Sequence, residues 1–293
     1  NTGAGTDIEG YNKLSHFTIT GGEANYVVLE NTGELTVVAK TTAKNTTVDA
    51  GGKLIVQKEA KTDTIRLNNG GVLEVQDGGE AKHVEQQSGG ALIASTTSGT
   101  LIEGTNSYGD VFYIRNSEAK NVVLENAGSL TVVTGSRAVD TIINANGKMD
   151  VYGKDVGTVL NSAGTQTIYA SATSEKANIK GGKQTVYGLA TEANIESGEQ
   201  IVDGGSTDKT HIKGGTQTVQ NYGKAINTDI VSGLQQIMAN GTAEGSIING
   251  GSQVVNEDGL AENSVLNDGG TLDVREKGSA TGVQQSSQGA LVA

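Results

Sequence analysis

A glycine-anchored repeat runs through almost all of this 293-residue chain and constrains its fold more than any other feature. The segment VVLENTGELTVV at 27–38 returns as VVLENAGSLTVV at 122–133, five intervals of 19 residues further on. The pattern glycine, any residue, apolar residue, any residue, valine recurs, with variants, at spacings of 16 to 19. A fixed short period of this kind is typical of solenoid proteins. Fifteen glycines serve as anchors: Gly33, Gly52, Gly71, Gly90, Gly109, Gly128, Gly147, Gly164, Gly182, Gly198, Gly215, Gly233, Gly251, Gly270 and Gly289.

The alternation after each anchor indicates β-strands. Leu35 and Val37 share one face of a strand, because side chains in a strand alternate with period two. A unit of 16–19 residues cannot bury its own apolar face, but stacked units can. The length fits one coil of a parallel β-helix with three short strands and three turns, and a helical period is absent. We therefore predict an all-β, three-faced parallel β-helix of about 15 coils, with an irregular junction near 99–117.

A duplication divides the chain. Residues 5–38 correspond to 99–133, and Phe17 and Phe112, the only phenylalanines, lie 95 residues apart within it. We interpret 1–94 as a first β-helix cassette and 95–293 as a second, longer one continuous with the first. The segments 5–22 and 99–117 interrupt the regular coil. They are predicted to form a hairpin or altered coil that marks a bend; the alternative is a protruding binding element.

Composition excludes several classes of protein. The formal net charge is −12, and only four arginines are present, so the basic footprint of a nucleic-acid-binding protein is lacking. The chain has no cysteine, which excludes disulfides and thiolate metal sites. No apolar run approaches the roughly 18 residues of a membrane-spanning helix.

The sequence offers no catalytic constellation, so we predict no enzymatic activity, no cofactor and no metal site. Some parallel β-helices act on polysaccharides through clustered carboxylates, but here the acidic residues are scattered, and the histidines His16, His83 and His211 are isolated. The motif G-x-S-x-G is absent. Acid–glycine turns, at Asp77 and Asp203 for example, are expected to be ordinary solvated turns; weak surface calcium is the alternative.

Six glutamines occupy the same phase in successive repeats. Period two places each on the face of the following isoleucine or valine, and therefore inward. A stacked amide ladder would satisfy their hydrogen-bonding groups. The alternative is an exposed comb of amides that binds a ligand. The six are Gln166, Gln184, Gln200, Gln217, Gln235 and Gln253.

These repeats resemble the passenger repeats of AIDA-type autotransporter adhesins. The pattern G-x-Q-x-V at 182–186 and 215–219 carries the likeness, and the junction from Gly104 to Gly128 is similar to that of antigen 43 type passengers. The resemblance covers essentially the whole chain. It implies a right-handed parallel β-helix exposed on the outer membrane surface of a Gram-negative bacterium. It also implies self-association between cells, with aggregation, biofilm formation and a role in virulence.

In the self-associating relatives, asparagine and threonine side chains at turns form a long interface between two rods. By this resemblance, the candidate self-association edge here comprises Asn45, Thr46, Thr62, Asp63, Asp140 and Thr141. The alternative is that these residues only cap turns. The expected partners are copies of the same protein; a host matrix protein or glycan and a glycosyltransferase are further candidate partners. A host-ligand module for matrix protein or glycosaminoglycan is the second functional hypothesis, and a polysaccharide-acting enzyme is a distant third.

Overall fold

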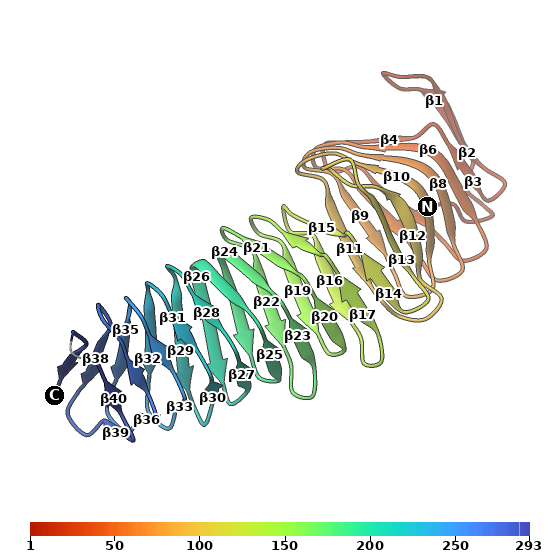
Figure 1. Ribbon diagram of the computed structural model, residues 1–293. Coiled ribbons are helices and arrows are strands. Elements are labelled where there is room, and N and C mark those ends of the chain that lie inside the picture. Colours follow the sequence, from red (N-terminus) through yellow and green to blue (C-terminus); the bar gives the residue numbers. More distant parts are fainter. Residues whose placement is uncertain (287) are drawn as a thin grey trace. The chain divides into compact units, whose positions relative to one another are not determined.

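The computed structural model of the chain describes residues 1–286 and 288–293. It consists of strands arranged as a parallel β-solenoid of about 14 turns (Figure 1). Two compact units can be distinguished, Asn1–Met149 and Asp150–Ala293, and their boundary falls within strand β19 (Lys148–Val151). The described residues include no helix long and apolar enough to cross a membrane. The predicted cassettes, divided at residue 94, describe a duplication of the sequence and not compact units of the structure. That division stays a prediction.

Each regular coil contributes one strand to each of three faces, as predicted. The strand after the anchor glycine lies on what we call the anchor face, the next on the middle face and the last on the short face. In unit 2, parallel strands of successive coils pair on each face. The anchor face contains β22 (Thr165–Ile168), β29 (Thr216–Gln220), β32 (Leu234–Ile237), β35 (Ser252–Val255), β38 (Thr271–Val274) and β41 (Ala290–Val292).

The middle face of unit 2 contains strands of three residues: β20 (Lys154–Val156), β23 (Thr173–Glu175), β25 (Leu189–Thr191), β27 (Ser206–Asp208), β30 (Lys224–Ile226), β33 (Thr242–Glu244), β36 (Leu260–Glu262) and β39 (Ser279–Thr281). The short face contains β21 (Val159–Asn161), β28 (His211–Ile212), β31 (Asp229–Ile230), β34 (Ile247–Ile248), β37 (Val265–Leu266) and β40 (Gln284–Gln285). Two longer strands run from the short face onto the anchor face: β24 (Asn178–Val186) and β26 (Asn194–Asp203).

Unit 1 follows the same plan, with the middle and short faces often joined in one strand. Its anchor face contains β5 (Glu34–Val37), β7 (Lys53–Val56), β9 (Val72–Val75), β11 (Ala91–Ser95) and β16 (Ser129–Val132). The other two faces contain β3 (Glu23–Asn25), β4 (Val28–Leu29), β6 (Thr42–Val48), β8 (Lys61–Leu67), β10 (Glu80–Gln86), β14 (Glu118–Lys120), β15 (Val123–Leu124), β17 (Arg137–Val139) and β18 (Ile142–Ile143).

The anchor glycines recur because neighbouring coils approach too closely for a side chain. A Cβ atom on Gly52 would lie 2.2 Å from the carbonyl oxygen of Leu29, and one on Gly71 would lie 2.4 Å from that of Val48. Gly109 is the exception among the fifteen predicted anchors. It lies in the loop between β12 (Leu101–Thr105) and β13 (Val111–Arg115) and therefore starts no coil.

The junction near 99–117 contains a β-hairpin, so the predicted irregular junction is confirmed. Strand β12 pairs in parallel with β10, whereas β13 is antiparallel to both β12 and β14. On the anchor face, β11 pairs directly with β16. The middle face thus gains two strands, at about 4.8 Å each, that the anchor face lacks, so the coils of unit 1 on either side of the hairpin cannot remain parallel. The duplicated segment forms an equivalent hairpin from β1 (Ile8–Tyr11) and β2 (His16–Thr20).

The interior differs between the units. In unit 1 the inward position of the anchor face carries leucine, as at Leu35, Leu54 and Leu73, all no more than 2% exposed. In unit 2 the same position carries the six glutamines, which are 0–1% exposed, so the prediction that they point inward is confirmed. From Gln184 onward, each Nε2 donates to the Oε1 of the preceding glutamine at 2.6–2.8 Å. The alternative hypothesis, an exposed comb of amides that binds a ligand, is therefore wrong, because the buried amides are not accessible to a ligand.

Candidate functional site

One corner of the solenoid carries an unusual backbone in nearly every coil. Where the chain passes from the middle to the short face, a single residue adopts a left-handed conformation. In unit 1 these corner residues include Tyr26 (φ 56°), Asn45 (φ 52°), Thr64 (φ 57°) and His83 (φ 49°). They are 19 residues apart, so they come from four consecutive coils. Left-handed geometry is unfavourable for most L-residues, and its repetition points to a turn imposed by the fold.

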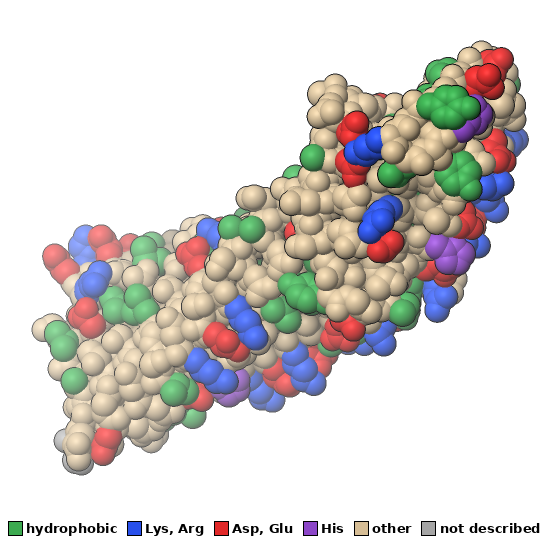
Figure 2. All heavy atoms as spheres, turned by 90° about the horizontal axis from the view of Figure 1, so that it is seen from above, with side chains coloured by type: hydrophobic (Ala, Val, Ile, Leu, Met, Phe, Trp, Pro, Cys, Tyr) green, Lys and Arg blue, Asp and Glu red, His purple; other side chains and the backbone are tan. Residues whose placement is uncertain are grey.

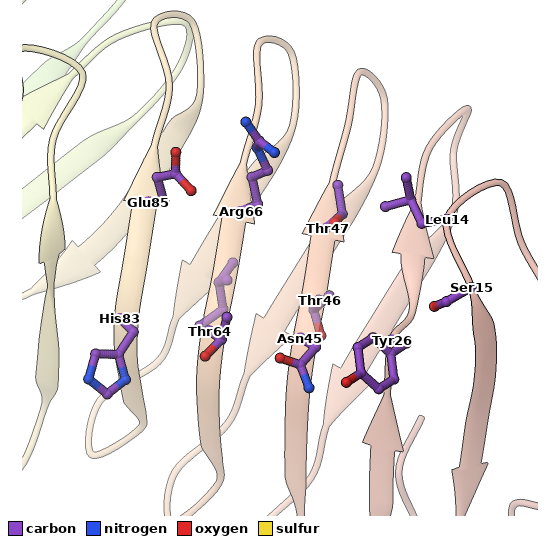
Figure 3. Close-up of a pocket in the computed structure, with 11 residues that line it drawn as sticks. Leu14, Ser15, Tyr26, Asn45, Thr46, Thr47, Thr64, Arg66, His83 and Glu85 are labelled. Carbon is purple, nitrogen blue, oxygen red and sulfur yellow. The ribbon is translucent and has the colours of Figure 1, made fainter.

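The corner residues line a groove of about 240 Å³ in unit 1. Figure 3 shows two rows of side chains crossing consecutive strands: the corner row, and a second row formed by Thr47, Arg66 and Glu85. Tyr26 is 49% exposed, and Thr64, His83, Arg66 and Glu85 are also exposed. The groove therefore presents aromatic, hydroxyl, imidazole and charged groups to solvent.

The loop of the first hairpin lies over one end of this groove. Leu14 and Ser15 line the groove beside Tyr26 (Figure 3). Lys13 Nζ contacts Glu30 Oε2 at 2.5 Å and Asp49 Oδ2 at 2.7 Å. These contacts hold the pKa of the Asp49 carboxyl below its ordinary value, with the hydrogen bond from Lys13 as the largest cause. The loop is thus attached to two coils of the unit.

Asp63 and His83 form a pair beside the groove. His83 Nδ1 lies 2.8 Å from Asp63 Oδ1, which also accepts a hydrogen bond from Thr64 Oγ1 at 2.9 Å. The hydrogen bond with His83 is the main reason that the pKa of Asp63 lies below its ordinary value. Asn45 Nδ2 donates to Asn25 Oδ1 at 3.0 Å. These side chains are linked from coil to coil but remain accessible.

The structure divides the six residues of the predicted edge. Thr46, Thr62 and Thr141 are 1%, 3% and 0% exposed, so their side chains leave almost no surface for a second molecule, although Thr46 borders the groove. The reason is the left-handed corner, which turns the chain so that the next residue points inward: Thr46 follows Asn45, and Thr141 follows Asp140 (φ 54°). Thr62 pairs with the inward Ala43 of the preceding coil.

The remaining three members stay accessible. Asn45 lines the groove, Asp63 contacts the groove residue His83, and Asp140 is exposed at the same corner of a later coil, outside the groove. Sequence reasoning missed Tyr26, Arg66 and His83. The spacing of 19 from Asn45 could have identified Tyr26 and His83.

Nothing in the described residues forms a metal centre. No group of three histidine, aspartate or glutamate side chains lies close enough there to hold an ion. Three lysines of the middle face in unit 1 are paired: Lys44 with Glu23 at 3.1 Å, and Lys61 and Lys82 with Glu80 at 3.1 and 2.7 Å. On the side of the molecule drawn in Figure 2, basic and acidic side chains are interspersed.

Comparison with known proteins identifies the family. The model of the AIDA family, described as an adhesin of the bacterial autotransporter system and a probable stalk, matches residues 9–71, 103–164 and 237–289. The chain is 96% identical, over 99% of its length, to the probable autotransporter YpjA of Escherichia coli K12, but it spans only 19% of that protein.

A solved structure agrees with this assignment. The TibC-catalysed, hyper-glycosylated TibA fragment superposes with a TM-score of 0.63 at 29% sequence identity, covering 92% of this chain and 95% of that one. The matched family is one of adhesins and not of enzymes. This chain belongs to the AIDA family of bacterial autotransporter adhesins.

Proposed function

We propose that the chain is part of an adhesin passenger displayed on the outer surface of a Gram-negative bacterium, where copies on neighbouring cells associate through the groove of unit 1. One observation carries the proposal: four consecutive coils present corner side chains beside a single groove. A second copy has the same spacing from coil to coil. Contacts between two aligned copies would therefore repeat, and many weak contacts would give avidity without one strong site.

The chemistry of the groove favours a self-complementary partner. Arg66 and Glu85 offer charges of opposite sign from neighbouring coils, and Asn45 and His83 offer donors and acceptors. An antiparallel second copy would place its Arg66 near Glu85 of the first. Pairs of this kind at an exposed surface contribute little each, which suits reversible clumping of cells.

The glycosaminoglycan hypothesis has less support. A polyanion needs an unbroken basic stripe, whereas three lysines of the middle face in unit 1, Lys44, Lys61 and Lys82, are paired with glutamates. Modification by a glycosyltransferase is a second proposal, because the similar TibA fragment was hyper-glycosylated by TibC catalysis. Mass spectrometry of the chain co-expressed with such an enzyme would test it; an unchanged mass would contradict it.

The test of self-association is cell clumping by the full-length passenger displayed on bacteria. Asn45→Gly and His83→Gly remove two groove side chains at left-handed positions, where glycine fits without strain. We expect the double variant to settle at least several-fold more slowly than the parent. Asn227→Gly and Asn263→Gly, at the same corner in unit 2 (φ 52° and 54°), serve as the matched control and should clump normally. Equal clumping of both double variants would exclude the groove.

A further inference from the structure

Three tyrosines project from consecutive turns of unit 2 between the anchor and middle faces. The rings of Tyr152 and Tyr169 stack at 4.2 Å between centroids and 8° between planes. The ring of Tyr187 continues the stack at 6.3 Å and 28°. The outer two are 42% and 44% exposed. Three aromatic rings on the outside of a chain with only eight tyrosines and no tryptophan form a distinct surface feature.

The turns that carry these rings have unequal lengths. Two residues, 187–188, connect β24 to β25, whereas four residues, 169–172, connect β22 to β23 on the preceding coil. The four-residue turn is followed by two short ones, 187–188 and 204–205, and beside it lies a depression of about 470 Å³, which we call the Tyr187 notch. Its principal lining residues are Tyr187, Gly188, Leu189, Ser171, Thr173 and Ser206.

The floor of the notch is fixed by backbone packing. A Cβ atom on Gly188 would lie 2.4 Å from the carbonyl oxygen of Tyr169 and 2.5 Å from that of Ala172. A glycine is therefore required where the short turn crosses the longer one. The depression results from two backbones in contact and is not an accident of side-chain rotamers.

One side of the Tyr187 ring is left open toward the notch. Tyr169 stacks against the other side. On the next coil, Asp203 follows Val202, the register partner of Val186, and its carboxylate accepts hydrogen bonds from Gln220 and Asn221 on the coil beyond, at 3.3 and 2.9 Å. The next turn then continues with Gly204 and Gly205, which also line the notch and add no side chain.

A hydrogen bond to Asp150 fixes the central tyrosine of the stack. Tyr169 Oη donates to Asp150 Oδ1 at 3.4 Å. Its neighbours Tyr152 and Asp150, together with partial burial, raise the pKa of Tyr169 to about 12. A platform that is already ordered loses less entropy when a ligand binds.

The chemistry of the notch matches a neutral sugar. Among the residues that the structure describes, no charged side chain lines it, which removes the basis for recognising an anion or a cation. An aromatic face carries negative charge density and attracts C–H groups of a pyranose ring, while Ser171, Thr173 and Ser206 supply hydroxyl groups that both donate and accept. An apolar surface with a few converging polar groups is typical of small-ligand sites.

We propose that the Tyr187 notch binds a neutral pyranose residue of a glycan, stacked on Tyr187 and hydrogen-bonded to the surrounding hydroxyl groups. A shallow, open site of this size would bind a single oligosaccharide with a Kd on the order of 1 mM. The site lies in unit 2 and shares no residue with the groove of unit 1. It is therefore independent of the proposal of self-association.

The experiment is titration of the purified 293-residue chain with neutral oligosaccharides, namely cellohexaose, a β-1,4-galactan hexamer and mannohexaose, with heparin hexasaccharide as the charged comparison. Binding is measured by saturation-transfer NMR. We expect at least one neutral sugar to bind, Tyr187→Ala to weaken it at least tenfold, and Tyr187→Phe to retain it. Tyr11→Ala removes an 85% exposed tyrosine on β1, in unit 1, and should bind like the parent.

The outcomes decide the proposal. Circular dichroism establishes that each variant is folded before titration. Three outcomes would overturn the proposed sugar site. They are equal binding by Tyr187→Ala and the parent, binding of heparin alone, and no binding of any neutral sugar or of a glycosylated copy. The sugar has two sources, a free polysaccharide or a glycan carried by another copy. Capture of immobilised polysaccharide and of glycosylated chain, each lost in Tyr187→Ala, distinguishes them, and either result supports the notch.

Discussion

The side-chain Nε2 of Gln235 donates a hydrogen bond to Oε1 of Gln217, one coil earlier, at 2.7 Å. Gln235 Oε1 in turn accepts from Gln253 at 2.6 Å and from Ser246 at 3.0 Å. Both residues are completely buried. All the amide donors of the ladder point toward the N-terminus, so each glutamine satisfies the next. The polar interior of unit 2 is stable only as a continuous network, since a buried unpaired group costs about 1–3 kcal/mol.

Interrupting the ladder should destabilise unit 2. Gln235→Leu keeps the approximate volume but leaves Gln253 and Ser246 without their acceptor, so we expect the free energy of unfolding to fall by about 2–4 kcal/mol. Urea denaturation followed by hydrogen exchange measures the loss and locates it. Gln236→Leu, the outward neighbour on β32, is the control and should change stability little. A loss of equal size in both variants would show that the ladder contributes nothing special.

The ladder ends on a buried carboxylate. Gln166 Nε2 and Ser174 Oγ donate to Asp155 Oδ2 at 2.8 and 2.9 Å, and Thr158 Oγ1 donates to Asp155 Oδ1 at 2.6 Å. Burial is the largest influence on this carboxyl and raises its pKa above the ordinary value of 3.8, although these three hydrogen bonds act in the opposite direction. Asp155 thus supplies the acceptor that the last amide requires.

Asp155 should make stability depend on pH. Its pKa is raised in the folded state, so between pH 3.8 and that raised pKa the folded chain binds more protons than the unfolded chain. Its contribution to the free energy of unfolding therefore decreases as pH rises through this window. We expect Asp155→Asn to flatten this part of the profile, measured as urea midpoints from pH 4 to 8. Parallel profiles for variant and parent would refute the assignment.

Close packing at the anchors predicts a large effect from one methyl group. Gly52→Ala would bring Cβ to 2.2 Å from the Leu29 carbonyl oxygen, so the two coils must separate. We expect a loss of about 1–3 kcal/mol or more, seen as a lower melting temperature. Gly5→Ala is matched to it, because a Cβ there meets nothing within 4 Å and should leave the melting temperature unchanged. Similar melting curves for both would be incompatible with the packing described.

Thr46 provides a test that separates stability from adhesion. Within the described part of the chain, its buried Oγ1 has no hydrogen-bond partner. Thr46→Val replaces the hydroxyl by a methyl group of similar shape, and we expect the free energy of unfolding to rise by about 1 kcal/mol. Clumping by displayed cells should not change, because the side chain does not reach the surface. If the variant is more stable but the cells clump less, Thr46 does take part in self-association, in spite of its burial.

The sequence by itself determined the solenoid. Glycines at intervals of 16–19 residues and the period-two pattern after them are local signals, and the same signal repeated along the chain could be satisfied only by stacking. The inward glutamine ladder followed from the same phase, and the interruption near 99–117 was visible as a break in the repeat. The family also followed from these residues, since its likeness lies in the repeat itself.

Tertiary structure decided which polar residues of the predicted edge are accessible. The left-handed corner at Asn45 reverses the alternation expected of one continuous strand, so Thr46 is buried and Asn45 is not. The groove and the Tyr187 notch could likewise be identified only from the tertiary structure. Both depend on the alignment of neighbouring coils and on unequal turn lengths, and a local sequence pattern does not specify what residues 19 positions apart build together.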